Sequence, residues 1–353
     1  MTFPAPSLDH VARLTDDVGI FEHALGPVPR RANGYCTDDN GRALAVACRD
    51  HWDPRAARLA ERYLAFLVHA HEGGGRFRLR LGYDRRWTDD PTSDDASGRA
   101  IFGLGIAAVQ GPEHLRETAH ECFTAAAGFR SSFPRAIAHA AVGAAEVLAV
   151  RSEDAAAIEL LRDAAATLPR PVPGAEWVWP EPRLAYANAL IPEALIATGA
   201  ALDDGALLAD GLRLLTWLVE EETDRRHERF SFTPTGGRGP DDLRPAFDQQ
   251  PIEAASFAEA CARAFIVTKD AGWLEPLRRS VGWFLGENDA GVALFDPSTG
   301  GGADGLHDDG VNRNQGAEST LMLMVTLQLA QRFLVPVGKG VQAARTAASA
   351  AKS

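Results

Sequence analysis

Carboxylate side chains stand where polar stretches of this sequence run into apolar, alanine-rich segments. The neighbours Asp38 and Asp39 precede one such segment, and Arg42 follows them. Pro251 suits the first position of another helix, which places Glu253 in its first turn. Two carboxyl groups in different protonation states can act as general acid and general base. We therefore predict a catalytic group drawn from Asp38, Asp39 and Glu253.

Helix capping is the structural alternative for these residues. A single N-cap accounts for one side chain near Asp38 and Asp39, and a capping box accounts for Glu253. The helix dipole also favours the ionised form of Glu253. A general acid needs the opposite shift in pKa, which burial or a like-charged neighbour can supply.

Further polar stretches carry side chains of the types that bind sugars. Aromatic faces cover the apolar side of a pyranose ring, and amides and carboxylates bond its hydroxyl groups. The alternatives are a solvated acidic loop at Asp94 and Asp95, core packing for the tryptophans, and capping near Glu318. The predicted sugar-binding residues are Tyr35, Arg42, Trp87, Asp94, Asp95, Arg99, Trp179, Tyr186, Asn188, Gln250, Asn314, Gln315 and Glu318.

The same change from polar to apolar residues recurs about six times along the sequence. The helices that it indicates must position the candidate site residues. Segments that are apolar on nearly all sides, such as Ala136–Val150 and Thr320–Ala330, indicate buried helices. Amphipathic segments lie between them and indicate half-exposed helices. The polar starts are Asp38–Arg42, Asp94–Arg99, Phe133–Ala136, Arg183–Asn188, Gln250–Glu253 and Gln315–Glu318, and the amphipathic segments are Leu8–Leu25, Pro54–Ala70, Pro112–Ala127, Ser152–Leu168, Asp204–Glu222 and Trp273–Leu285.

This alternation predicts an all-α fold, an (α/α)6 toroid of inner and outer helices. An open solenoid has the same local pattern, but the repeat number and the apolar terminal units favour closure. Inner helices of a ring all run the same way, so their starts meet at one central depression. We expect one domain over residues 1–337, a flexible tail over 338–353, and small hairpins within Arg76–Tyr83 and Val292–Phe295.

The composition excludes several classes of partner. A formal net charge of −12 repels nucleic acid and anionic membrane surfaces. The sequence has no apolar run of the length of a membrane helix, and its four cysteines lack metal-ligand spacing. Residues Met1 to Asp9 lack a basic stretch followed by an apolar run, so we expect no secretory leader. Gly103-Leu104-Gly105 imitates a dinucleotide-binding motif but lies within a predicted helix. We expect a soluble cytoplasmic protein, a monomer or a homodimer, without metal or cofactor.

Five motifs resemble a family of bacterial toroid proteins that occur alone or fused behind glycosyltransferase domains. One branch of this family is similar to an endo-acting α-mannosidase that trims methylated mannose polysaccharides. The resemblance implies that Glu253 and either Asp38 or Asp39 form the catalytic pair. Asp94 and Ser97 depart from the family pattern, which has Glu and His there. The motifs are Tyr35–Arg42, Tyr83–Trp87, Ser93–Arg99, Phe247–Ala254 and Gly305–Thr320.

These observations predict a glycoside hydrolase that acts on a mannose-containing oligosaccharide or polysaccharide. By analogy of fold we expect an inverting α-mannosidase, with Glu253 as general acid and Asp38 or Asp39 as general base. The alternatives are an inverting phosphorylase, a sugar 2-epimerase that would need the histidines His139 and His307, and a non-catalytic carbohydrate-binding toroid serving a glycosyltransferase.

Overall fold

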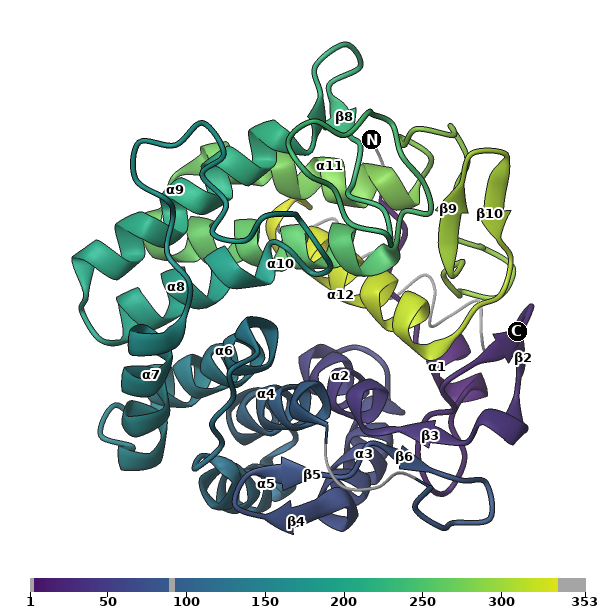
Figure 1. The fold of residues 1–353 in the computed structure, drawn as a ribbon. Helices are drawn as coiled ribbons and strands as arrows, with labels where there is room; N and C mark the ends of the chain where they lie inside the picture. The colour runs from purple at the N-terminus through teal and green to yellow at the C-terminus, as the bar shows by residue number, and fades with distance from the viewer. Residues whose placement is uncertain (1–2, 89–92, 336–353) are drawn as a thin grey trace.

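The computed structural model describes residues 3–88 and 93–335, and Figure 1 shows the path of the chain. Six helices form an inner ring, in which each packs against the next and the last packs against the first. This closed all-α toroid confirms the predicted fold class and excludes the open solenoid. The inner helices are α2 (Thr37–Arg49), α4 (Asp94–Gln110), α6 (Pro134–Val150), α8 (Leu190–Ala201), α10 (Pro251–Thr268) and α12 (Ala317–Phe333).

Five outer helices cover the ring, and each packs on the inner helix that precedes it in the chain. Their burial follows the helical period, as in α3, where Leu59, Tyr63 and Leu67 face inward and Arg58 and Arg62 face solvent. Their bounds confirm five of the predicted amphipathic helices to within a few residues. The outer helices are α3 (Ala56–Ala70), α5 (Glu113–Ala126), α7 (Ala155–Thr167), α9 (Gly205–Glu221) and α11 (Leu274–Phe284).

The predicted helix over Leu8–Leu25 is wrong beyond its first turns. Helix α1 (Asp9–Arg13) is short and packs against α12. The Asp16 carboxylate then accepts hydrogen bonds from the backbone N–H groups of Val18 and Gly19 at 2.8 and 3.4 Å. Such local bonds compete with the helical pattern. The chain instead turns into the hairpin of β1 (Ala24–Leu25) and β2 (Val28–Pro29).

Glycines allow the inner helices α2, α4 and α6 to approach each other closely. A Cβ atom on Gly103 would stand 2.5 Å from the carbonyl oxygen of Gly41, and one on Gly105 would stand 2.4 Å from that of Gly143. No larger side chain fits such contacts without moving a helix. The Gly103-Leu104-Gly105 sequence therefore serves helix packing.

Short antiparallel strands fix the loops that lead into the inner helices. The strand β3 (Tyr35–Cys36) precedes α2 and pairs with β6 (Arg80–Leu81), and β9 (Gly305–His307) pairs with β10 (Gly310–Asn312). Gln249 exchanges backbone hydrogen bonds of 3.0 and 2.9 Å with Leu306 of β9, which ties the start of α10 to the loop before α12. The remaining pairs are β4 (His71–Gly73) with β5 (Arg76–Phe77) and β7 (Thr223–Asp224) with β8 (Arg229–Phe230).

The two predicted hairpins are wrong in their pairing. Within Arg76–Tyr83, the strands β5 and β6 pair with β4 and β3 and not with each other. Within Val292–Phe295, a single bridge joins Phe295 to Gly302. The sequence of a short strand does not indicate which strand it pairs with, because pairing depends on which segments the helices bring together.

None of the helices in the described part of the chain has the length and apolar character needed to cross a membrane. The predicted domain boundary at residue 337 and the tail that follows it lie outside the described residues.

Charged side chains that are mostly shielded from solvent meet inside the ring. Arg263 of α10 contacts Glu146 of α6 and lies 3.8 Å from Glu193 of α8. Arg49 of α2 pairs with Glu259 of α10 at 2.8 Å. Three carboxylates thus share two guanidinium groups. Burial, reinforced by the charge of Glu259, raises the pKa of Glu193 above its ordinary value of 4.5.

This raised pKa makes a prediction for stability. In the unfolded chain Glu193 ionises near pH 4.5, whereas the folded protein holds the proton to a higher pH, so stability is lost as pH rises above about 5. We expect Glu193→Gln to raise the free energy of unfolding by about 1–2 kcal/mol at pH 8 and to leave it unchanged at pH 4. Urea denaturation at both pH values measures this. Glu146→Gln is the matched control and should destabilise the protein, and an equal gain at both pH values for Glu193→Gln would contradict the prediction.

Candidate functional site

A cleft opens where the inner helices begin. Its larger part, a cavity of about 510 Å³, is lined by side chains from the starts of α2, α4 and α12. Its smaller part, a cavity of about 360 Å³, is lined by Tyr186 and by residues at the start of α10. Asp248, Gln250 and Glu318 line both cavities, so the two adjoin as parts of one cleft. The predicted meeting of helix starts is therefore present on this face of the ring.

Asp38 presents a carboxylate to the larger cavity. Its Oδ2 atom accepts a hydrogen bond of 2.9 Å from the Arg99 guanidinium group, and that pair is largely buried. Its Oδ1 atom is buried and has no hydrogen-bond partner among the described residues. Asp38 thus combines a fixed orientation with one carboxylate oxygen left without a hydrogen bond, and 16% of its side chain is exposed.

Asp39 lies deeper than its neighbour and is committed to an ion pair. It accepts a hydrogen bond of 2.7 Å from Arg42, which also contacts Glu318 at 2.6 Å. Burial raises the pKa of Asp39 to about 7, although Arg42 opposes that shift. Only 5% of its side chain is exposed, compared with 16% for Asp38. The geometry therefore distinguishes the two aspartates that the sequence left equivalent.

Glu253 lines the smaller cavity and is only 2% exposed. Its Oε1 atom accepts a hydrogen bond of 2.5 Å from the Ala187 backbone, and its Oε2 atom accepts two of 3.2 Å from the backbone and side chain of Asn188. Burial raises its pKa to about 8, with a smaller contribution from the charge of Glu222, while the backbone hydrogen bonds act in the opposite direction. A carboxyl group with this pKa holds its proton at neutral pH, as a general acid requires.

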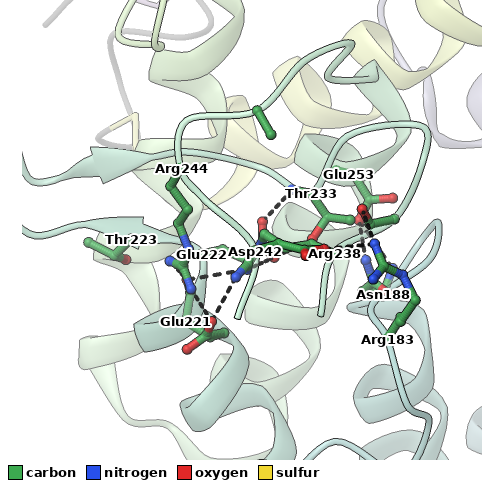
Figure 2. A network of polar contacts seen from close by, with 12 residues as sticks. Arg183, Asn188, Glu221, Glu222, Thr223, Thr233, Arg238, Asp242, Arg244 and Glu253 are labelled. Atoms are coloured by element: carbon green, nitrogen blue, oxygen red, sulfur yellow. Dashed lines mark hydrogen bonds and ion pairs between the residues drawn. The ribbon is translucent and has the colours of Figure 1, made fainter. Parts of the chain in front are cut away.

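Glu222 belongs to a buried network close to Glu253, which Figure 2 shows. It accepts hydrogen bonds of 2.6 Å from both the backbone N–H and the hydroxyl group of Thr233. Arg238 pairs with Glu222 and with Glu221, at 2.7 Å each. Arg238 also exchanges backbone hydrogen bonds of 2.8 and 2.9 Å with Leu184, so the network supports the loop that holds Glu253.

The position of Glu222 makes a prediction for the pH dependence of activity. Replacing it with glutamine removes a negative charge, which should lower the pKa of Glu253 and move the alkaline limit of activity to lower pH. We expect a shift of about half a pH unit or more in the profile of kcat. Arg238 keeps its contact with Glu221 in this variant. Glu221→Gln is the matched control and should leave the limit unchanged; a loss of activity without a shift would indicate that Glu222 only supports the loop.

Tyr186 provides an aromatic surface within the smaller cavity. It is 37% exposed, and its hydroxyl group donates a hydrogen bond of 2.7 Å to Asp95 across the cleft. Arg135 anchors its loop by pairing with Glu181 at 2.8 Å and by bonding Asn188 at 3.2 Å. The Tyr186 ring is thus held where it can cover one face of a sugar.

The other three predicted aromatic residues lie away from the cleft. Tyr35 is buried and donates a hydrogen bond of 2.7 Å to Asp16. Trp179 is 1% exposed and stacks near Trp217, so it fills the core as the structural alternative states. Trp87 packs against Phe66 and His69 beside α3. None of the three lines either cavity.

Four predicted polar residues have partners within the protein. Asp94 accepts a hydrogen bond of 2.6 Å from Ser131, and Asn314 accepts one of 3.0 Å from the backbone of Gly26. Gln315 donates to Asp296 at 2.8 Å, and Asn188 supports Glu253. None of these four lines the cleft, whereas Arg42, Asp95, Arg99, Gln250 and Glu318 do.

Other residues of the cleft were not among the predicted site residues. Asp248 belongs to the motif Phe247–Ala254 before α10, but nothing in the local sequence indicates its place in the cleft. Glu22 was hidden within the incorrectly predicted first helix. Asp304 accepts hydrogen bonds of 2.8 Å from the backbone of Gly316 and 2.5 Å from Ser319, and so fixes the start of α12. The missed residues that line the larger cavity include Glu22, His23, Arg80, Asp248, Asp304 and Ser319.

Comparisons with known proteins agree with the toroid. No protein-family model matches the chain, and no curated protein matches its sequence. Its structure is similar to that of cellobiose 2-epimerase from Bacillus thermoamylovorans, with a TM-score of 0.66 and 11% sequence identity over 92% of this chain and 96% of that one. It is similar to that of D-mannose isomerase, with a TM-score of 0.63 and 12% identity over 92% of this chain and 96% of that one. It is also similar to that of the cellulase Cel9M of C. cellulolyticum in complex with cellobiose, with a TM-score of 0.60 and 10% identity over 90% of this chain and 88% of that one. The likeness is one of fold.

Proposed function

We propose that this protein is a glycoside hydrolase that cleaves a mannose-containing oligosaccharide or polysaccharide. One observation carries the proposal: Asp38, a carboxylate with one oxygen left without a hydrogen bond, and Glu253, a carboxyl group with a raised pKa, line adjoining cavities of one cleft. Different protonation of two carboxyl groups is the requirement for acid–base cleavage of a glycosidic bond. Toroids of similar structure that act on sugars support the substrate class.

In the proposed reaction Glu253 donates its proton to the glycosidic oxygen as the bond from that oxygen to the anomeric carbon breaks. A water molecule attacks the anomeric carbon from the opposite side, and Asp38 accepts the proton that the water releases. Arg99 keeps Asp38 oriented and balances its charge. Since the two carboxyl groups line different cavities of one cleft, we propose that substrate and water fit between them, which favours inversion over retention.

Mannose as the sugar rests on the resemblance of the motifs, while the cleft supports a carbohydrate more generally. We propose that Tyr186 covers a sugar face, and that Asp95, Gln250 and Glu318 bond hydroxyl groups. A phosphorylase needs positively charged groups that bind phosphate. Arg42 and Arg99 are already paired with carboxylates, which disfavours this alternative. Neither His139 nor His307 lines the two cavities, which disfavours the epimerase alternative.

A single assay tests the proposal against its alternatives. The protein is incubated with a panel of manno- and gluco-oligosaccharides, and products and their anomeric configuration are followed by NMR. We expect cleavage of a mannose-containing member, with the inverted anomer formed first. Cleavage that needs phosphate would identify a phosphorylase, a changed sugar without cleavage an epimerase, and binding without turnover a carbohydrate-binding protein.

A further inference from the structure

Asp248 occupies the junction of the two cavities. It lines both of them, together with Gln250 and Glu318, so a sugar chain that runs through the cleft must pass its carboxyl group. The loop that carries it is fixed on both sides. Its backbone oxygen accepts hydrogen bonds of 2.8 and 3.1 Å from the backbone and hydroxyl group of Thr235. The next residue, Gln249, is paired with Leu306.

The chain leaves space for this carboxyl group on one side. A Cβ atom on Gly305 would stand 2.6 Å from the Asp248 Oδ1 atom, so any residue larger than glycine would displace it. The Gln250 side-chain amide lies beside the same carboxyl group. The backbone contacts and Gln250 therefore position Asp248, and its carboxyl group fits only because residue 305 is glycine.

The Oδ1 atom of Asp248 is buried and has no hydrogen-bond partner among the described residues. The residue as a whole is half-buried and lines both cavities, so a hydroxyl group in the cleft can reach its carboxyl group. A carboxyl oxygen that the protein leaves without a donor gains free energy from a bound donor. The charged groups around Asp248 are His307, which favours its ionised form, and Asp304, which opposes it. Asp304 is itself occupied by Gly316 and Ser319, so it does not compete for a ligand at the junction.

We propose that Asp248 determines specificity by accepting a hydrogen bond from one particular hydroxyl group of the sugar unit that lies between Asp38 and Glu253. This inference rests on the proposed function for the class of ligand. An acceptor that the protein holds in place discriminates between sugars, because a sugar lacking the matching hydroxyl group leaves it unpaired. Other carboxylates of the larger cavity, such as Asp39 and Asp304, already accept hydrogen bonds from the protein.

The test is a binding experiment that does not depend on turnover. Isothermal titration calorimetry gives the Kd of a manno-oligosaccharide, and of its monodeoxy analogues, for the Asp38→Asn protein with and without Asp248→Ala. We expect Asp248→Ala to weaken binding of the full sugar about 10- to 100-fold. We expect the analogue that lacks the matching hydroxyl group to bind both proteins equally. The remaining analogues should show the same loss as the full sugar.

Two controls keep the outcome clear. Asp17→Ala removes an exposed carboxylate on the outside of the ring, beside Arg85, and should not change the Kd. If Asp248→Ala does not fold, Asp248→Asn keeps the shape of the side chain and should still weaken binding of the full sugar. An unchanged Kd, or an equal loss for every analogue, would overturn the inference. Wild-type protein that binds in this pattern but cleaves nothing would overturn the proposed function alone.

Discussion

Asp38→Asn should lower the rate of glycan cleavage about 1,000-fold or more, because asparagine cannot accept the proton of the attacking water. The amide keeps the size of the side chain, and its oxygen can still accept the hydrogen bond from Arg99. The thermal midpoint should therefore stay within a few degrees of the wild-type value. The Michaelis constant should change little, since the loss concerns the transition state.

Asp39→Asn is the matched control, since the two residues are neighbours of identical chemistry. Asp39 is buried against Arg42, so its amide would leave a buried guanidinium group with one charged partner in place of two. We expect a loss of about 2 kcal/mol in the free energy of unfolding, with cleavage reduced far less than in Asp38→Asn. Wild-type cleavage by Asp38→Asn, with cleavage abolished in a stable Asp39→Asn protein, would assign the base to Asp39.

The sequence was sufficient to predict the arrangement of helices, because the inner segments are apolar on nearly all sides. A run such as Ala136–Val150 must be buried on nearly all sides, which the inner position in a ring provides. The polar starts of α2, α4, α10 and α12 then meet at the cleft. The same logic failed at Leu8–Leu25. Apolar residues there suggested a helix, but the Asp16 carboxylate bonds the backbone at Val18 and Gly19 and ends it.

Individual roles within the site were less predictable, because they depend on partners far away in the chain. The roles of Asp38 and Asp39 are separated only by the positions of Arg99 and Arg42. Trp179 carries the residue type of a sugar-binding site, yet its loop turns it into the core. Asp248 becomes notable only through the gap that Gly305 leaves beside it. Such contacts join segments that no local pattern connects.

The Glu253→Gln variant should distinguish a catalytic role of Glu253 from a structural one when it is tested on substrates with different leaving groups. We expect cleavage of natural glycosides to fall about 1,000-fold or more, because their leaving oxygen needs a proton. Glycosyl fluorides need no such proton, so their cleavage should remain within about tenfold of the wild-type rate. The glutamine also places an amide donor among the donors of Ala187 and Asn188, which should cost about 1–2 kcal/mol of stability.

The pH profile provides the second criterion for Glu253. A general acid acts in its protonated form, so wild-type cleavage of natural glycosides should be present below pH 8 and lost above it, in keeping with a pKa of about 8. Cleavage of a glycosyl fluoride by Glu253→Gln should lack this alkaline limit, since no acid remains to titrate.

If the variant instead lost activity equally on both substrates, Glu253 would serve to hold the Ala187–Asn188 loop, and the proton donor would have to be another carboxyl group of the cleft. Asp248 would then be the first to consider, because burial raises its pKa as well and it stands between the two cavities.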